Sequence, residues 1–294
     1  MPAEPSSLSP LQRVGYFAIN LVIQGVIQTA LALPHRIRVP LMGSLMTRVV
    51  GPVTGATKRI RNNLKLTCPD MSDEEIRNMC HAVPNNVGRT LIETYAGRDF
   101  VRHANANPPR GDGVSALEQS REEGKPVFLA TAHFGNYFAI RANLSERGLR
   151  MGSLYRRMKN PYFNAHYVRS ISFDNQLMFE QGPSGMRLLV KHLRQGGIIG
   201  ILHDVHVADG EQLTFFGQPC TTSLAIATMA LKYDAAIIPS YGIRAANGLN
   251  FDIVLNDPIP HTDPRTMMQA LNDDLESMVR NNMEQWFWVH RRWK

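Results

Sequence analysis

The chain has 294 residues, 44% of them hydrophobic and 19% charged, so it is long and apolar enough to bury one large core or two ordinary ones. Its three cysteines form no Cys-x-x-Cys pair, which excludes a cysteine-rich zinc module, argues against a disulfide framework and favours a reducing compartment. The net charge of +7 resides in residues 1–66, where eight Lys and Arg residues accompany one acid, Glu4; the remaining 24 bases and 24 acids balance.

This basic excess surrounds an uncharged segment, residues 14–34, whose 21 residues match the length of a membrane span. Polar side chains recur on one face of the predicted helix, at Asn20, Gln24 and Gln28, so the helix could span a membrane while packing on protein, or lie in the interface. The flanking bases expected to reach lipid phosphates are Arg13, Arg36 and Arg38. A buried helix of a soluble protein is the alternative. Nucleic-acid binding is not favoured because no reader motif is recognisable.

Farther along, Ser72 and Glu75 form a capping box that predicts a helix running toward Val83, and residues 104–113 are expected to form a loop. Beyond them, short apolar runs typical of strands alternate with helical stretches. Strands are predicted at 126–131, 149–155, 198–202, 236–241 and 249–254, and helices at 137–147, 184–194, 222–233 and 264–283. This order predicts an α/β fold with a mixed sheet flanked by helices. We expect a membrane-associated helical and basic segment at 1–66 and an α/β domain at 67–294.

His133 is the strongest candidate for a catalytic residue, because it lies where the first of these strands gives way to a helix. The positive end of the helix dipole disfavours another positive charge there, so the imidazole is expected to stay neutral and able to accept a proton. Gly135 would allow close approach of the backbone, and Asn136 would offer a donor to a substrate. A helix-capping or core histidine is the alternative.

A general base usually needs an acid to orient it, but the position about one helical turn after His133 holds Phe138, which cannot hydrogen-bond an imidazole. Asp204 closes a predicted strand and could face the same edge of the sheet as His133, although a turn residue is the alternative. His203 and His206 beside it suggest a metal site. Neighbouring side chains at a strand end point to opposite faces, however, so no metal is expected.

Two further pairs of residues are candidates for substrate contacts. Arg156 and Arg157 follow a predicted strand, and a guanidinium matches a phosphate bidentately, so they are either anion contacts or a surface pair. Phe215 and Phe216 lie among turn residues and either line an acyl channel or belong to the core. The last ten residues contain all three tryptophans beside basic groups, which suits a membrane–water boundary or a segment docked on the core.

Several blocks along the chain occur in the order known from one family. They are residues 132–137, 154–161, 196–204, 210–219, 237–239 and 286–294. On these blocks the chain resembles the bacterial lipid A biosynthesis acyltransferases, the lauroyl and myristoyl transferases of the lysophospholipid acyltransferase superfamily. The ordered set, which ends in a Trp/His/Arg signature, is more specific than any single block.

The resemblance implies an O-acyltransferase at the cytoplasmic face of the bacterial inner membrane. It would move a fatty acyl chain from acyl carrier protein or coenzyme A to a hydroxyl of a lipid A precursor or similar glycolipid, with no cofactor and no metal. His133 would be the base, Arg156 would contact phosphate, and Asp204 and Gly210 would lie in the block that shapes the acceptor side. Because Phe138 stands where the family has an acid, Asp204 would take the orienting role.

Phe138 also leaves two other functions open, namely transfer to another lipid, such as an aminolipid or lysophospholipid, and lipid binding without catalysis. A metal hydrolase that uses His203, Asp204 and His206 is a third alternative. For acyl transfer, the expected donors to the oxyanion are backbone amides near Gly135, together with Asn136.

Overall fold

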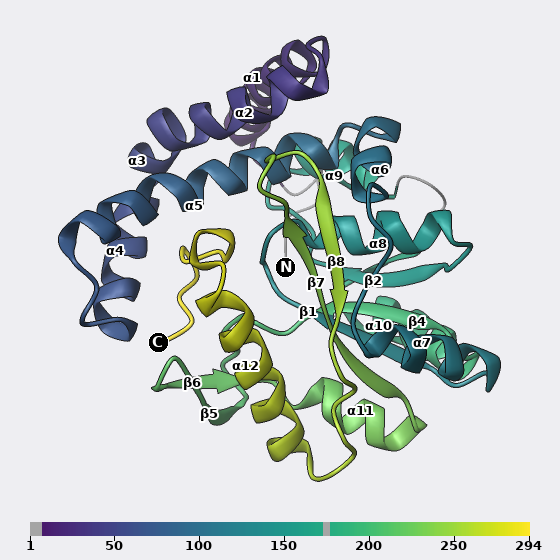
Figure 1. Ribbon diagram of the computed structural model, residues 1–294. Coiled ribbons are helices and arrows are strands. Elements are labelled where there is room, and N and C mark those ends of the chain that lie inside the picture. Colours follow the sequence, from purple (N-terminus) through teal and green to yellow (C-terminus); the bar gives the residue numbers. More distant parts are fainter. Residues whose placement is uncertain (1–7, 173–176) are drawn as a thin grey trace.

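The computed structural model describes residues 8–172 and 177–294, and its first five helices form a layer beside the rest of the molecule (Figure 1). They are α1 (Pro10–Leu31), α2 (His35–Leu45), α3 (Gly51–Val53), α4 (Ala56–Thr67) and α5 (Asp73–Thr94), with a π-helical turn at Met46–Val50. The expected capping box opens α5, since the Ser72 hydroxyl accepts from the Glu75 amide at 3.2 Å and the Glu75 carboxylate accepts from the Ser72 amide at 2.8 Å. The helix continues well past Val83, its expected end.

α1 exposes most of its apolar side chains, and its few buried residues include the polar Asn20, unlike an ordinary surface helix. Asn20 is buried and accepts a hydrogen bond from Gln24 at 3.2 Å, whereas Leu11 and Val22 are 83% and 69% exposed. Among the described residues, α1 is the one helix long and apolar enough to cross a membrane. The predicted apolar N-terminal helix is therefore confirmed.

One basic residue next to α1 has a different role from the one expected. Arg38 is buried, forms an ion pair with Asp99 at 2.8 Å and donates to the carbonyl of Leu33 at 3.2 Å. Its guanidinium therefore holds α2 against the body of the protein, and the expectation that it reaches lipid phosphates is wrong. Arg36, two residues earlier, is exposed.

A six-stranded sheet with the order β3-β2-β4-β1-β7-β8 forms the centre of the molecule (Figure 1). Its strands are β1 (Val127–Thr131), β2 (Met151–Tyr155), β3 (Leu177–Glu180), β4 (Ile198–Leu202), β7 (Ala236–Arg244) and β8 (Phe251–Leu255). All neighbouring strands are parallel except β8, which is antiparallel to β7. The expected mixed sheet is confirmed, and the carboxyl ends of its parallel strands share one edge.

Helices cover both faces of this sheet, which explains why β1 is a continuous apolar run rather than an alternating one. Val127 and Leu129 pack in the cluster under α6 (Arg98–Ala104), α7 (Gly113–Glu122) and α8 (Tyr137–Glu146). Phe128 and Ala130 pack in the opposite cluster, under the second group of helices. That group consists of α10 (Pro183–Arg194), α11 (Ala225–Tyr233) and α12 (Pro264–Arg280), while α9 (Pro161–Ile171) packs against α1.

A separate antiparallel hairpin, β5 (Glu211–Phe215) and β6 (Gln218–Thr222), lies where no strands were predicted. Thr222 therefore ends a strand, and α11 starts three residues later than expected, at Ala225.

The N-terminal helices are not independent of the α/β body. Buried residues of α1, α2 and α5 form one small core, which consists of Ile27, Ala30, Val39, Met42 and Ile92. The boundary expected after residue 66 falls in the last turn of α4, and the division of the chain at that point stays a prediction.

Candidate active site

His133 and Asp204 meet at the carboxyl edge of the sheet. β1 and β4 are parallel neighbours with Thr131 opposite Leu202, so residues at the same distance beyond the two strand ends lie side by side. His133 Nδ1 lies 2.9 Å from Asp204 Oδ1, and the His133 backbone N–H donates to Asp204 Oδ2 at 2.9 Å. The structure thus brings together the two residues that the sequence analysis paired.

Asp204 is fully buried, yet it remains ionised. Burial by itself would raise the pKa of its carboxyl group, but the charges and hydrogen bonds of His133 and His290 outweigh burial and hold this pKa well below its ordinary value. The indole of Trp286 also donates to Asp204 Oδ2, at 3.1 Å. The carboxylate is consequently a strong acceptor at neutral pH.

An ionised Asp204 decides the tautomer of His133. A carboxylate can only accept, so the proton of the neutral imidazole lies on Nδ1 and the lone pair lies on Nε2. Nε2 makes no hydrogen bond to any residue that the structure describes, and the side chain is 27% exposed. The ring of Tyr137 flanks it, with centroids 5.4 Å apart. The nitrogen opposite Asp204 is therefore free to accept a proton from an incoming group.

The C-terminal segment supplies two residues that the sequence analysis did not assign to the site. The N–H of Phe287 donates to the His133 carbonyl at 2.9 Å, which docks the segment directly on the loop that carries the base. His290 then stands perpendicular to His133, with ring centroids 4.6 Å apart, and its Nε2 lies 3.6 Å from Asp204 Oδ2. The only sequence signal for His290 and Trp286 was the Trp/His/Arg block, which carries no information about its position in space.

His133, Asp204 and His290 also lie close enough together to be considered as a metal site, since their ligand atoms fall within 4.8 Å of one another. Both oxygens of Asp204 already accept hydrogen bonds from protein N–H groups, however, so the geometry favours a hydrogen-bonded His133–Asp204 pair with His290 beside it, a triad in which only the first two are hydrogen-bonded. The set considered from the sequence, His203, Asp204 and His206, is not brought together, because among the described residues the group close enough to hold a metal is His133, Asp204 and His290.

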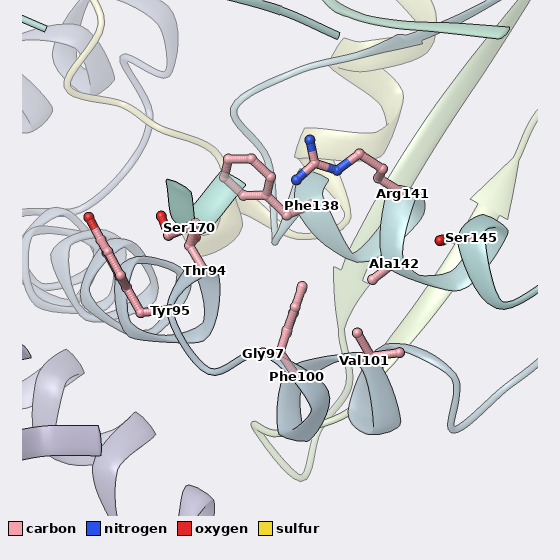
Figure 2. Close-up of a pocket in the computed structure, with 10 residues that line it drawn as sticks. All are labelled: Thr94, Tyr95, Gly97, Phe100, Val101, Phe138, Arg141, Ala142, Ser145 and Ser170. Atoms are coloured by element: carbon pink, nitrogen blue, oxygen red, sulfur yellow. The ribbon is translucent and has the colours of Figure 1, made fainter. Parts of the chain in front are cut away.

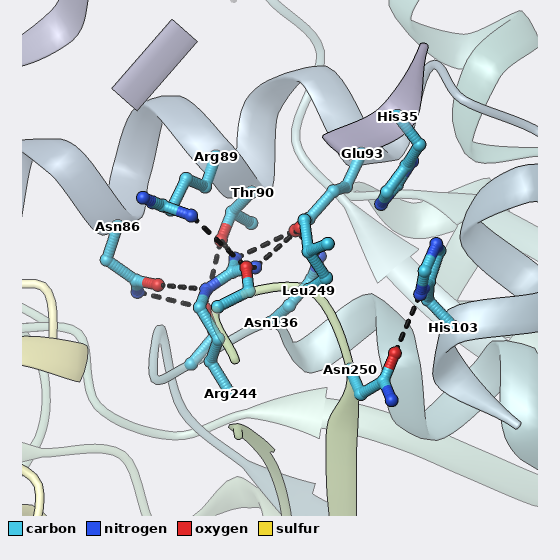
Figure 3. A network of polar contacts seen from close by, with 12 residues as sticks. His35, Asn86, Arg89, Thr90, Glu93, His103, Asn136, Arg244, Leu249 and Asn250 are labelled. Atoms are coloured by element: carbon cyan, nitrogen blue, oxygen red, sulfur yellow. Dashed lines mark hydrogen bonds and ion pairs between the residues drawn. The ribbon is translucent and has the colours of Figure 1, made fainter. Parts of the chain in front are cut away.

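A buried ion pair between Arg244 and Glu93 is the centre of a polar network that contacts the loop after His133 (Figure 3). Arg244 on β7 donates to both oxygens of Glu93 on α5 and, at 2.8 Å, to the side chain of Asn86. Asn86 and Thr90 in turn donate to the carbonyl of Gly135, at 3.2 and 3.0 Å. These contacts tie the loop to α5 and β7 and keep the base in one orientation.

Asn136 belongs to this network, and the expectation that it contacts substrate is wrong. Its amide donates to Glu93 at 2.8 Å, its oxygen accepts from the N–H of Phe138 at 3.0 Å, and the side chain is fully buried. It is the N-cap of α8. Gly135 does allow a close approach, but of the neighbouring strand: a Cβ there would lie 2.0 Å from the Gly242 carbonyl oxygen.

The backbone of this loop offers no oxyanion hole. The amide of His133 is bound to Asp204, that of Gly135 donates to the Gln285 carbonyl at 2.8 Å, and that of Asn136 donates to the Gly242 carbonyl at 2.9 Å. The amide of Phe134 is likewise engaged, by the carbonyl of Ala132 at 2.7 Å. The donors expected near Gly135 therefore have other partners.

Phe215 and Phe216 do not line an acyl channel, contrary to one of the two interpretations offered by the sequence. Both are buried, and their rings pack edge-on against Trp286 and Trp288, at centroid distances of 5.3 and 5.2 Å. The alternative, an ordinary core position, is correct, because the C-terminal tryptophans cover the β5–β6 hairpin.

Within the described residues, no hydrogen bond or ion pair joins Arg156, Arg157 or Gly210 to His133, Asp204 or His290. Arg156 is exposed and Arg157 half-buried just beyond β2, whose carboxyl end shares the functional edge of the sheet. Gly210 precedes β5, where an added Cβ would lie 2.5 Å from the Thr222 carbonyl oxygen, so its place is set by backbone packing. Their roles toward a substrate stay predictions.

Phe138 lines a cavity of about 70 Å³ (Figure 2). α5, α6, α8 and α9 supply the lining, which includes Phe100 and the buried Arg141. The Arg141 guanidinium lies 5.3 Å from the Phe138 ring, has no carboxylate partner among the described residues, and has a pKa lowered to about 10 by burial. Phe138 therefore belongs to the cavity wall and contacts a buried cation, while Asp204 orients the base.

Comparisons with known proteins show which family the chain is similar to. A family profile described as bacterial lipid A biosynthesis acyltransferase matches residues 6–294. A lipid A biosynthesis acyltransferase of Haemophilus influenzae is 22% identical over 87% of this chain and 81% of its own, and the lipid A biosynthesis lauroyltransferase of Escherichia coli is 22% identical over 92% and 89%. A phosphatidylinositol mannoside acyltransferase of Mycobacterium tuberculosis is 23% identical over 62% of this chain and 58% of its own.

Proposed function

The chain belongs to the bacterial lipid A biosynthesis acyltransferase family and is an acyltransferase, and from that premise we propose that it acylates a hydroxyl group of a lipid A precursor or similar glycolipid. The donor is a fatty acyl thioester, carried by acyl carrier protein or coenzyme A, and no cofactor takes part. The observation that carries the proposal is the pairing of His133 with the buried, ionised Asp204 at 2.9 Å. This pair provides what an alcohol nucleophile needs, a base with its lone pair directed outward.

The reaction follows from that tautomer. Nε2 of His133 removes the proton of the acceptor hydroxyl while its oxygen attacks the thioester carbonyl carbon, and the carbonyl electron pair moves to oxygen. The tetrahedral intermediate then reforms the carbonyl, the C–S bond breaks, and the thiolate takes the proton back from His133. Asp204 stays ionised throughout and stabilises the imidazolium that exists between the two steps.

We place the enzyme on the cytoplasmic face of the bacterial inner membrane. The support for this placement is α1, whose apolar side chains face outward, together with the exposed bases Arg36, Arg48 and Lys58 near it. Such a surface holds the site next to a lipid acceptor. An acidic carrier protein would be attracted by basic groups near the site, which speeds docking.

A different lipid acceptor is the second candidate. The mycobacterial relative carries the name of a phosphatidylinositol mannoside acyltransferase, and Phe138 replaces the acid of the usual family pattern. Lipid binding without catalysis has less support, because Asp204 completes the pair that Phe138 leaves incomplete.

The test measures acyl transfer by the purified protein, with product masses recorded for a panel of acyl carriers and lipid acceptors. We expect His133→Ala and Asp204→Asn to lower kcat, the former by ~10²–10⁴-fold, because each removes part of the base. His81→Ala is the matched control, an exposed histidine on α5 that we expect to leave the rate unchanged. Equal rates for parent and His133→Ala would overturn the mechanism.

A further inference from the structure

The proposed reaction requires a hydrogen-bond donor for the oxygen that becomes negative in the tetrahedral intermediate. Loss of such a donor typically lowers kcat by ~10²–10³-fold. In this protein the amides from His133 to Asn136 are all engaged, and the Asn136 side chain is buried on Glu93. A donor from another element that lies next to His133 would meet this requirement.

We propose that His290 is this donor, and hence a second catalytic histidine; the inference rests on the proposed acyl transfer. Its ring lies beside that of His133, with centroids 4.6 Å apart, and both rings face the carboxylate of Asp204. Each imidazole turns one nitrogen toward Asp204, so its second nitrogen points away from the carboxylate. The two outward nitrogens are Nε2 of His133 and Nδ1 of His290, on rings whose centroids lie 4.6 Å apart.

The contacts of His290 leave Nδ1 free to donate. Its buried Nε2 lies 3.6 Å from Asp204 Oδ2 and makes no hydrogen bond, and Nδ1 likewise makes none within residues 8–172 and 177–294. In this role His290 carries a proton on each nitrogen, with Nε2–H toward the carboxylate and Nδ1–H toward the substrate. During the reaction His290 keeps both protons, and only His133 exchanges one with the hydroxyl and the thiolate.

The other groups next to His133 are less suited to this role. The indole N–H of Trp286 is already donated to Asp204, at 3.1 Å. Tyr137 is the remaining candidate, because its buried hydroxyl is influenced by Asp204 as well as by Tyr167 and Arg141. Tyr137→Phe therefore enters the experiment as the competing assignment.

The first measurement compares the steady-state kinetics of His290→Ala and His290→Gln with those of the parent. We expect the alanine variant to lose ~10²–10³-fold in kcat with little change in the KM for the acyl thioester, and the glutamine variant, whose amide can still donate, to recover part of that loss. Arg291→Ala is the control, an exposed neighbour in the same segment. The assignment would be overturned by an unchanged kcat for His290→Ala, or by an effect of that substitution on KM alone. It would also be overturned if Tyr137→Phe, and not His290→Ala, lowered kcat.

The second measurement separates oxyanion stabilisation from a purely structural role. A trifluoromethyl ketone analogue of the acyl donor, which adds a hydroxyl to form an oxyanion, is compared with an unreactive thioether analogue. We expect His290→Ala to weaken ketone binding by about the same factor as kcat and to leave thioether binding within about twofold, since only the first mimics the transition state. Parallel weakening of both analogues contradicts the proposal. If the parent turns over no acyl thioester, the proposed function itself is overturned. If the parent is active and His290→Ala has the same kcat, only this inference is overturned.

Discussion

The two ends of the chain have similar compositions, apolar side chains next to basic ones, but the fold treats them in opposite ways. At the N-terminal end, α1 exposes Leu11 and Val22 and buries the polar Asn20. At the C-terminal end, Trp286, Trp288 and even the basic Arg292 are buried. The C-terminal segment therefore forms part of the core next to the candidate active site, while α1 presents its apolar surface to the surroundings.

The two ends differ in whether the rest of the protein offers an apolar surface for their side chains to pack against. The C-terminal tryptophans meet Phe215, Phe216 and one another, and Arg292 donates to the Thr221 carbonyl at 3.0 Å. The apolar face of α1 meets no comparable surface in the described parts of the chain. Of the two terminal segments expected to suit a membrane boundary, only α1 therefore remains a candidate.

Trp286→Ala tests the C-terminal end and has the largest expected effect. Removing a fully buried indole costs ~3–5 kcal/mol of unfolding free energy, and it also deprives Asp204 of the donor at 3.1 Å. We expect a lower urea midpoint together with reduced acyl transfer. Lys294→Ala, at an exposed position in the same segment, is the control, and a stability equal to that of the parent would show that the tryptophan cluster is not part of the core.

The stability of the protein at acid pH tests Asp204, the residue that both His133 and the C-terminal segment contact. Because the pKa of Asp204 is lowered in the folded state, its ionised form stabilises the fold above the unfolded-state value of ~3.9, and this contribution is lost as the pH falls from there through the folded-state pKa. We expect urea unfolding of the parent to lose stability more steeply than Asp204→Asn in this window. Identical slopes for the two proteins would mean that the carboxyl titrates alike in both states.

Substitutions on α1 have the smallest expected effect on stability. A variant with Leu11, Val14 and Val22 changed to serine alters exposed positions only, so its unfolding free energy should differ from that of the parent by about 0.5 kcal/mol per site or less. Its partitioning onto anionic vesicles should fall, because apolar area available for burial in lipid is lost. Ile27→Ser, which changes a buried position of the same helix, should instead lower the unfolding free energy. Unchanged vesicle binding by the triple variant would remove α1 as the membrane contact.

The polar network around Asn136 and Glu93 shows which features of the site local sequence patterns can predict and which they cannot. The strand before His133 and the helix after it follow from apolar periodicity, and Asn136 was recognisable as a polar residue at a helix start. Its partner Glu93 lies 43 residues away on another element, and no periodicity connects the two. A donor that looks free in the sequence is therefore engaged in the structure.

By itself, the sequence determined the elements that depend on short-range order. These are the apolar α1, the alternation of strands and helices, and the placement of His133 and Asp204 at the ends of two strands. If the two strands are parallel neighbours, that placement predicts that His133 and Asp204 meet. Only the tertiary structure decided which surfaces are covered. It buried Phe215, Phe216 and Asn136, and it brought Trp286 and His290 to Asp204, because burial and hydrogen bonding depend on contacts between residues far apart in the chain, whereas hydrophobic periodicity reports only on neighbours within a turn or a strand.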